Sequence, residues 1–232
     1  MNPPQVGVVH LWWSTLHATA SELGELHRVL SSDEVAWAMQ FRLPEDRERA
    51  VVRRGRLRLL LGRYLCVEPA SLRFSYTQHG KPALVGALGT PRLCFNLSYS
   101  GDTVLYGVTA DRELGVDLEQ VRQISVDALV TDYFLTPQEL QMLRGVSTAA
   151  RQATFFACWT LKEAYVKGTG EGLTADFADL DVSAAQTGRG VMEHTGWSLR
   201  RVHAGAGYAC ALALAGDLQG VEHRRWPLEW QI

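Results

Sequence analysis

Two acidic side chains, Asp117 and Glu119, are separated by one residue in a short run of branched apolar residues at 114–119. Such a run predicts a strand, in which alternate side chains point to the same face. The two carboxylates therefore face one space, where they would repel each other and raise one pKa unless a cation lies between them. Mg²⁺ prefers such oxygen ligands together with water and substrate phosphate. Taken alone, the pair more often marks a solvated strand face.

A second group of charged residues lies at 159–167, in the longest helical pattern of the second half of the chain. At about 3.6 residues per turn, one face roughly 140° wide holds Trp159, Lys162, Glu163, Val166 and Lys167. A face that should be buried but carries two lysines and a glutamate needs charged partners, because unpaired charge is rarely buried. The alternative for this pattern is a simple intrahelical pair of Glu163 and Lys167.

Three further segments carry groups that bind phosphate. Gly80-Lys81-Pro82 predicts a tight turn that presents a lysine, and Asn96-Leu97-Ser98-Tyr99-Ser100-Gly101 presents hydroxyls and amides at a strand-to-strand turn. Eight arginines lie from Arg42 to Arg63, and one or two of them are candidates to clamp a phosphate. Each segment taken alone is more often an ordinary turn or a solvated helix face.

Composition excludes several classes of function. The chain has 232 residues, of which 47% are hydrophobic and 21% charged, as in an ordinary globular protein. Its formal net charge of -2 draws it neither to nucleic acid nor to an anionic membrane. The sequence holds no H-x-x-x-H, G-x-S-x-G or P-loop motif, which argues against zinc hydrolases, serine hydrolases and P-loop enzymes.

The cysteines and the N-terminus predict a cellular compartment. Cys66, Cys94, Cys158 and Cys210 show no paired spacing, so we expect reduced thiols in the core. The first residues lack a basic region followed by an apolar run, and no stretch of about 18 apolar residues occurs. We therefore expect a cytoplasmic protein.

Four segments of the first half recur in the same order in the second half. Residues 6–11 match 114–119 as strands, 41–46 match 134–139 as helix starts with proline before acids, and 101–111 match 207–217 as hairpin strands. A helix follows each helix start, expected at 45–64 in the first copy and at 138–144 and 150–167 in the second. Chance likeness between short apolar strands is the alternative.

The repeat predicts an α+β fold of two similar lobes, 1–112 and 113–232, related by pseudo-twofold symmetry. Each lobe would have a helix packed on a small, mainly antiparallel sheet. A duplicated fold leaves a cleft between its lobes, and ligand sites occur preferentially in such clefts.

Four of these motifs in order, Gly80-Lys81-Pro82, Phe95-Asn96-Leu97-Ser98-Tyr99-Ser100-Gly101, Gly115-Val116-Asp117-Leu118-Glu119 and Trp159-x-x-Lys162-Glu163-Ala164-x-x-Lys167, resemble the Sfp-type 4′-phosphopantetheinyl transferases of the W/KEA branch. The resemblance implies a two-lobed monomer with its active site between the lobes. It also implies coenzyme A as substrate, Mg²⁺ or Mn²⁺ as the metal, and an acyl or peptidyl carrier protein as partner.

The resemblance assigns roles to individual residues. A histidine that contacts a CoA phosphate in the family is replaced here by Tyr99, which keeps a donor but carries no positive charge. The other implied roles are metal binding by Asp117, Glu119 and Glu163, contact of Lys162 and Lys167 with the CoA pyrophosphate, a place for Lys81 near adenine or its phosphate, and a place for Ser98 and Arg49 near the 3′-phosphate.

The implied reaction is transfer of the 4′-phosphopantetheinyl group from CoA to a carrier-protein serine, with release of 3′,5′-ADP. Glu163 would be the base for the serine, and Lys162 would neutralise or protonate the departing oxygen. Two alternatives stay open. One is a CoA-binding module without catalysis, and the other is a Mg²⁺-dependent phosphohydrolase that uses water as nucleophile.

Overall fold

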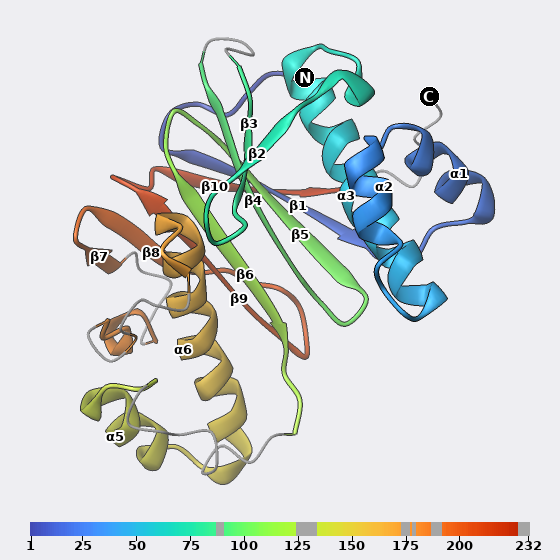
Figure 1. Ribbon diagram of the computed structural model, residues 1–232. Coiled ribbons are helices and arrows are strands. Elements are labelled where there is room, and N and C mark those ends of the chain that lie inside the picture. The colour runs from blue at the N-terminus through green and yellow to red at the C-terminus, as the bar shows by residue number, and fades with distance from the viewer. Residues whose placement is uncertain (87–90, 124–133, 173–176, 178–179, 187–191, 227–232) are drawn as a thin grey trace.

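The computed structural model describes residues 1–86, 91–123, 134–172, 177, 180–186 and 192–226 (Figure 1). Its helices are α1 (Ala20–Arg28), α2 (Ser32–Ala38), α3 (Pro44–Leu65), α5 (Pro137–Gly145) and α6 (Thr148–Thr169), with short 3₁₀ turns η1 (Pro69–Ser71) and η3 (Ser183–Gln186). Its strands are β1 (Val8–Thr15), β2 (Phe74–Tyr76), β3 (Pro82–Leu84), β4 (Leu93–Ser100), β5 (Thr103–Ala110), β6 (Leu114–Gln120), β7 (Met192–His194), β8 (Trp197–Arg201), β9 (Tyr208–Ala215) and β10 (Gly220–Arg225).

Two four-stranded sheets carry the fold, with strand orders β10-β1-β5-β4 and β6-β9-β8-β7. Every pairing within them is antiparallel except β1 with β10, which run parallel. The predicted α+β class and the mainly antiparallel sheets are confirmed. One part of the predicted lobe boundary is wrong, because β10 returns to the first sheet and pairs with β1 instead of staying with residues 113–232.

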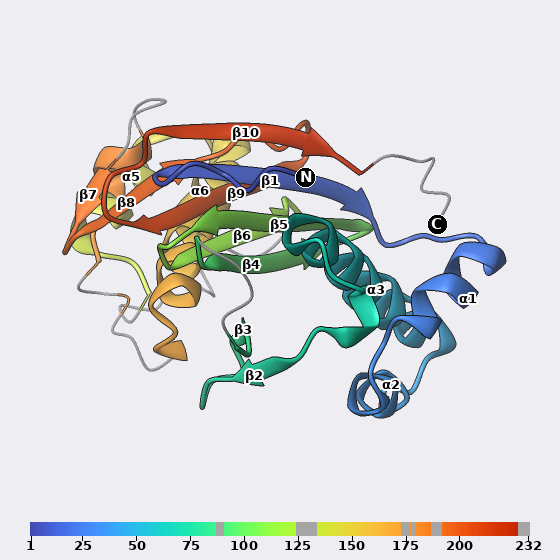
Figure 2. The same cartoon turned by 90° about the horizontal axis from the view of Figure 1, so that it is seen from above.

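The two sheets pack face to face, and the long helices cover their outer faces (Figures 1 and 2). Between the sheets lies an apolar layer from both halves of the chain, which includes Val9, Leu11 and Leu105 on one side and Val116, Leu118 and Leu212 on the other. Leucines of α3 pack on the far face of the first sheet. Helix α6 packs on the far face of the second sheet. The repeat read from the sequence is thus a repeat of sheet and covering helix.

Local signals set the helix ends close to the predicted positions. Proline occupies the first turn of α3 and of α5, where its missing N–H costs nothing. Thr136 and Glu139 form a capping box in which each side chain accepts a hydrogen bond from the backbone of the other. The helices predicted at 45–64, 138–144 and 150–167 are confirmed within two residues at each end.

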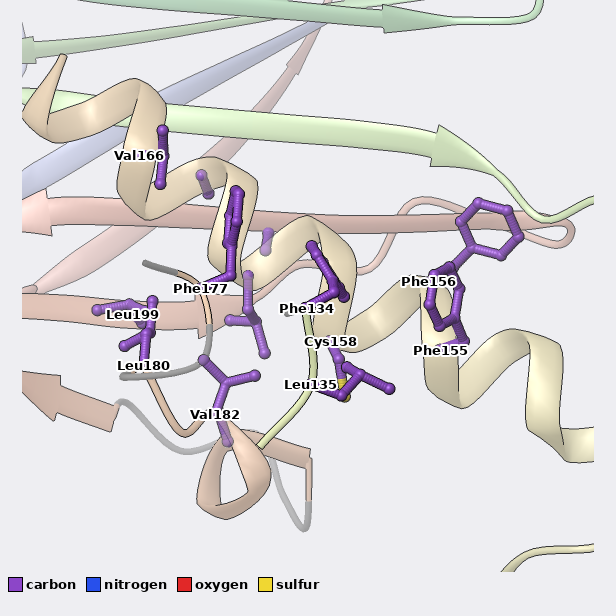
Figure 3. Packing of buried hydrophobic residues seen from close by; sticks show 14 of the residues in the cluster. Phe134, Leu135, Phe155, Phe156, Cys158, Val166, Phe177, Leu180, Val182 and Leu199 are labelled. Carbon is purple, nitrogen blue, oxygen red and sulfur yellow. The ribbon is translucent and has the colours of Figure 1, made fainter. Parts of the chain in front are cut away.

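Several aromatic rings pack together in the core around α6 (Figure 3). Phe134 stacks on Trp159 with ring centroids 4.5 Å apart and lies 5.0 Å from Phe177. Trp159 of the W-x-x-K-E-A motif is therefore a packing residue, which fixes the rotation of α6 about its own axis.

The cysteine prediction is confirmed for three thiols and wrong for one. Cys94, Cys158 and Cys210 are buried, and burial raises the pKa of Cys158 to about 12. Cys66 is exposed, because it caps α3 in the left-handed conformation with φ of 54°. Within the described residues, none of the helices is long and apolar enough to cross a membrane.

Candidate active site

The two lobes meet where β4 lies beside β6. Among the described strands, β6 ends its sheet and pairs only with β9, and along its other edge side chains of β4 accept hydrogen bonds from its amides. Three alternate β4 side chains accept hydrogen bonds from three alternate β6 amides: Asn96 from Val116 (3.0 Å), Ser98 from Leu118 (3.2 Å) and Ser100 from Gln120 (3.0 Å). This seam fixes the register of the second lobe against the first.

The seam also holds the first carboxylate. The Oγ of Ser98 donates to Oδ1 of Asp117 at 2.9 Å. The Nζ of Lys167, on α6, donates to the same Oδ1 at 2.5 Å and to Ser98 Oγ at 3.1 Å. Asp117 is only 2% exposed, and its Oδ2 is buried with no hydrogen-bond partner among the described residues. A buried carboxylate oxygen without a donor lacks a cation or a donor from outside the chain.

Two further carboxylates share this space. Ser100 Oγ donates to Oε2 of Glu119 at 2.8 Å, yet burial and the charge of Asp117 raise the pKa of Glu119. Burial raises the pKa of Glu163 as well, aided by the charges of Asp117 and Glu119 and opposed by Lys167. Three acids with one nearby ammonium leave the site short of positive charge.

A divalent cation fits this set by chemistry, because hard cations take carboxylate oxygens. Its ligands would be the oxygens of Asp117, Glu119 and Glu163. Within the described ranges, no group of three or more His, Cys, Asp or Glu side chains is arranged so that it could hold a metal ion. The charge of Asp117 acts on both Glu119 and Glu163, and the ammonium of Lys167 pairs with Asp117.

Gly115 of β6 allows α6, which carries Glu163, to approach β6 closely. A Cβ atom at this position would lie 2.0 Å from the carbonyl oxygen of Ala164 and 2.4 Å from the amide nitrogen of Gly168. Helix and strand are in backbone contact here, which no side chain larger than hydrogen permits. Glu163 and Lys167, one turn apart on α6, therefore reach the same region as Asp117.

Lys162 does not lie in this site, and the expectation that it contacts the pyrophosphate or the departing oxygen is not supported by its position. It is fully buried on the other side of α6, where its Nζ pairs with Glu139 at 2.7 Å. It also donates to the carbonyl oxygens of Phe134 at 2.8 Å and Phe177 at 2.7 Å. The physical reason is angular, since Lys162 and Lys167 occupy opposite edges of a helix face about 140° wide.

Glu139 is a residue that the sequence interpretation missed. Its buried carboxylate accepts from the Thr136 amide at 2.9 Å, from the Val182 amide at 2.8 Å and pairs with Lys162. The signal that could have found it is the capping-box spacing Thr136-x-x-Glu139. Glu139 lies on α5 and Lys162 on α6, and the pair also binds the backbone of Val182 and Phe177 in the segment after α6. The pair therefore stabilises this lobe.

The first lobe places Lys81 at the end of α6. Its Nζ donates to the Gly168 carbonyl oxygen at 2.6 Å and pairs with Glu113 at 2.8 Å. This contact ties the β2–β3 turn to the second lobe beside the seam. Contact of Lys81 with adenine or its phosphate stays a prediction.

Arg49 and Tyr99 lie around the β4–β5 turn, whereas Ser98 points the other way. Arg49 pairs with Asp102 at 2.5 Å and donates to the Gly101 carbonyl oxygen at 3.3 Å. Tyr99 is 48% exposed, and the guanidinium carbon of Arg53 lies 3.9 Å from its ring centroid. Because adjacent strand residues face opposite sides, Ser98 points toward Asp117 and Tyr99 points toward Arg53. A place for Ser98 and Arg49 near the 3′-phosphate stays a prediction.

Comparison with known proteins agrees with this geometry. The model of the 4′-phosphopantetheinyl transferase superfamily matches residues 113–213, and that of the 4′-phosphopantetheinyl transferase N-terminal region matches residues 13–110. The boundary between the two matches falls at the start of β6, where the seam between the lobes begins.

Individual relatives cover most of the chain. The 4′-phosphopantetheinyl transferase HetI of Nostoc sp. is 39% identical over 210 residues, which is 90% of this chain and 88% of the relative. The 4′-phosphopantetheinyl transferase Sfp of Bacillus subtilis is 25% identical over 206 residues, 82% of this chain and 89% of that protein. With paired acids on β6, a third acid on α6 and these matches over both lobes, the chain belongs to the 4′-phosphopantetheinyl transferase superfamily.

Proposed function

We propose that this chain transfers the 4′-phosphopantetheinyl group of CoA to a serine of an apo acyl or peptidyl carrier protein and acts as a monomer. The observation that carries the proposal is the group of three acids at the seam, in which Oδ2 of Asp117 is buried without a donor. The relatives named as 4′-phosphopantetheinyl transferases support the same reaction.

The reaction breaks a phosphoanhydride bond and forms a phosphodiester. The serine oxygen forms a bond to the phosphorus on the pantetheine side, the anhydride P–O bond breaks, and 3′,5′-ADP leaves with the bonding electron pair. The serine proton must go to a base. Glu163 is suited to accept it, because burial and neighbouring charges raise the pKa of its carboxyl.

Asp117, Glu119 and Glu163 would hold Mg²⁺, or Mn²⁺ in its place. When bound, the metal would neutralise charge on the diphosphate and orient it. Ser98 and Ser100 hold the carboxylates of Asp117 and Glu119 in place through hydrogen bonds of 2.9 and 2.8 Å. Such outer-shell partners orient the ligands that they contact.

Of the two lysines predicted to contact the diphosphate, we keep Lys167 in this role and leave Lys162 out. Its side chain is 32% exposed and lies against Asp117, whereas the Lys162 side chain is fully buried with Glu139. When the substrate binds, the Lys167 ammonium would turn from Asp117 toward the phosphate oxygens. Lys167 then stabilises the charge that develops on the leaving group.

The test incubates the protein with CoA, Mg²⁺ and apo carrier proteins and measures the intact masses of the carriers. A phosphopantetheine mass increment that disappears with EDTA is expected. Asp117→Ala and Glu163→Gln should lower the transfer rate by about 10²–10³ while the protein stays folded, because preorganised charge is lost. Glu68→Gln, at an exposed acid outside the seam, is the matched control and should transfer normally.

The two alternatives give different outcomes in the same experiment. CoA cleavage that proceeds equally well without any carrier protein would identify a phosphohydrolase. Tight CoA binding with no mass increment on any carrier would identify a binding module. Near-normal transfer by Asp117→Ala or Glu163→Gln would refute the roles assigned to these acids.

A further inference from the structure

The β2–β3 hairpin lies outside both four-stranded sheets and beside the C-terminal end of α6 (Figures 1 and 2). Phe74 anchors the hairpin to the first lobe, because its ring centroid lies 5.7 Å from that of Phe95 on β4. The turn of the hairpin is closed by two hydrogen bonds: the Thr77 amide donates to the Lys81 carbonyl oxygen at 3.0 Å, and the Lys81 amide donates to Thr77 Oγ1 at 3.1 Å. The backbone of Lys81 therefore has a fixed position on the first lobe.

The Lys81 side chain crosses from this hairpin to the second lobe. Its Nζ donates to the Gly168 carbonyl oxygen at 2.6 Å and pairs with Glu113 at 2.8 Å, and only 12% of the side chain is exposed. Glu113 directly precedes β6. One ammonium thus joins the hairpin turn, the start of β6 and the end of α6, and we call these contacts the Lys81 bridge.

The carbonyl oxygen of Gly168 is a group that needs a donor from outside its helix. The last four carbonyls of a helix have no intrahelical partner, and Gly168 lies in the final turn of α6. Gly168 is buried, so an unpaired carbonyl at this position would be costly. A lysine ammonium at the negative end of the helix dipole supplies a charge-assisted hydrogen bond.

The turn of α6 that the bridge contacts also carries a residue of the candidate site. Lys167, which pairs with Asp117, directly precedes Gly168. Gly168 is closely packed on both sides, since a Cβ at Gly115 would lie 2.4 Å from its amide nitrogen and a Cβ at Gly168 would lie 2.6 Å from the Trp197 ring. A small displacement of this turn therefore moves Lys167 relative to Asp117.

A second contact joins the hairpin turn to the segment after α6. A Cβ atom at Gly172 would lie 2.7 Å from Nδ1 of His79, so the His79 ring covers the backbone there. The helix ends between these two contacts, with Gly170 as its C-cap. The hairpin turn thus covers the chain on both sides of the helix end.

We propose that Lys81 and Glu113 are positioning residues for the transfer reaction, because the Lys81 bridge holds the last turn of α6 and with it Lys167. The inference rests on the proposed function for the reaction that it serves. It gives Lys81 a task that does not require contact with the nucleotide. The two roles predict different kinetics, since a residue that positions a group acting only in the transition state lowers kcat and kcat/KM equally.

The kinetic test measures carrier-protein modification as a function of CoA concentration. Lys81→Met should lower kcat by about 10- to 100-fold, the effect of misplacing a charged group by up to about 1 Å. The KM for CoA and the affinity for 3′,5′-ADP, measured by calorimetry, should change by less than about twofold. Lys81→Arg keeps a charged donor and should keep kcat within about threefold of the unmodified protein.

Two further variants test the part of Glu113. Glu113→Gln should lower kcat by about threefold on its own and have no further effect when added to Lys81→Met, because the two side chains act through one contact. Arg92→Met is the matched control: Arg92 also pairs with Glu113, at 3.1 Å, but its side chain is 63% exposed, so this pair contributes little. Glu113 is itself 46% exposed, so no variant leaves a buried charge, and urea unfolding checks that each is folded.

Amide hydrogen exchange tests the bridge without any reaction. In Lys81→Met the amides at 165–170 should exchange about tenfold faster, because the helix end loses its outside donor, while those at 155–160 keep their rates. Lys81→Arg and Arg92→Met should exchange as the unmodified protein does.

The outcomes separate this inference from the proposed function. If the protein modifies no carrier but Lys81→Met loosens residues 165–170, the proposed function fails and the structural part of the inference holds. If Lys81→Met weakens 3′,5′-ADP binding while kcat and exchange at 165–170 stay unchanged, Lys81 is a nucleotide contact and the positioning role is overturned, although transfer itself stands. Additive losses of kcat in the variant that combines Lys81→Met with Glu113→Gln would also contradict a single bridge.

Discussion

Replacement of Gly115 by alanine tests whether close approach of α6 to β6 builds the site. The added Cβ would meet the Ala164 carbonyl oxygen at 2.0 Å and the Gly168 amide nitrogen and Cα at 2.4 and 2.9 Å. All three are backbone atoms, so no side-chain rotation relieves the clash. Ordinary contact needs a separation of about 3.4 Å, so α6 must move away from β6 by roughly 1 Å.

The magnitude follows from that displacement. Overpacking against a rigid backbone costs about 3 kcal/mol in the free energy of unfolding, the upper end of the usual range. A shift of about 1 Å also moves Glu163 and Lys167 away from Asp117, and misplacement of this size lowers a rate by about 10²-fold. Gly115→Ala should therefore lose more activity than its loss of folded protein explains.

The assay compares urea unfolding with the initial rate of carrier-protein modification at a temperature where the variant is fully folded. Gly24→Ala is the matched control, because a Cβ at Gly24, inside α1, meets nothing within 4 Å. That variant should gain up to about 1 kcal/mol of stability, as alanine does over glycine in helices, and transfer normally. Unchanged stability and rate in Gly115→Ala would refute the close-contact account.

Three more changes test other parts of the structure. Lys162→Met should destabilise the protein by about 3–5 kcal/mol, because it leaves Glu139 buried without its counter-ion, and addition of Glu139→Gln should recover part of that loss in urea unfolding. Ser100→Ala removes the hydroxyl that orients Glu119 and should raise the Mg²⁺ concentration needed for half-maximal transfer about tenfold. Burial, aided by Arg224 and opposed by Glu222, lowers the pKa of His10 from 6.5 to about 4, so the unfolded state binds the extra proton between these values and stability falls as pH drops through that window. Unfolding free energies should be about 2 kcal/mol lower at pH 5 than at pH 8 through this residue, and a His10→Gln variant with the same pH slope would contradict the assignment.

Part of the site could be predicted from the sequence, because strand and helix periodicity is local. The two-residue period of a strand sets Asp117 and Glu119 on one face, and the helical period sets Glu163 and Lys167 one turn apart. The charge of Asp117 is among the causes that raise the pKa values of Glu119 and Glu163, whereas a shared metal site for the three acids stays a prediction.

Other parts depend on contacts between segments far apart in the chain. The sequence interpretation grouped Lys162 with Lys167, since both lie on one broad helix face, yet Glu139 captures the first and Asp117 the second. Periodicity states which residues share a face, but it does not state which neighbouring element covers each edge of that face. The sequence does not distinguish Arg53 from the other seven arginines at 42–63. In the structure its guanidinium stacks on the ring of Tyr99.

The sequence by itself determined the helices α3, α5 and α6, the duplicated sheet-and-helix plan and the candidate site residues at 114–119 and 159–167. Those features come from local backbone preference and from the period of apolar side chains, both written in the order of the residues. Only the tertiary structure decided that β10 pairs with β1 and that Ser98 donates a hydrogen bond to Asp117. Such choices depend on the packing of whole sheets, where many weak long-range contacts compete and no single motif sets the outcome.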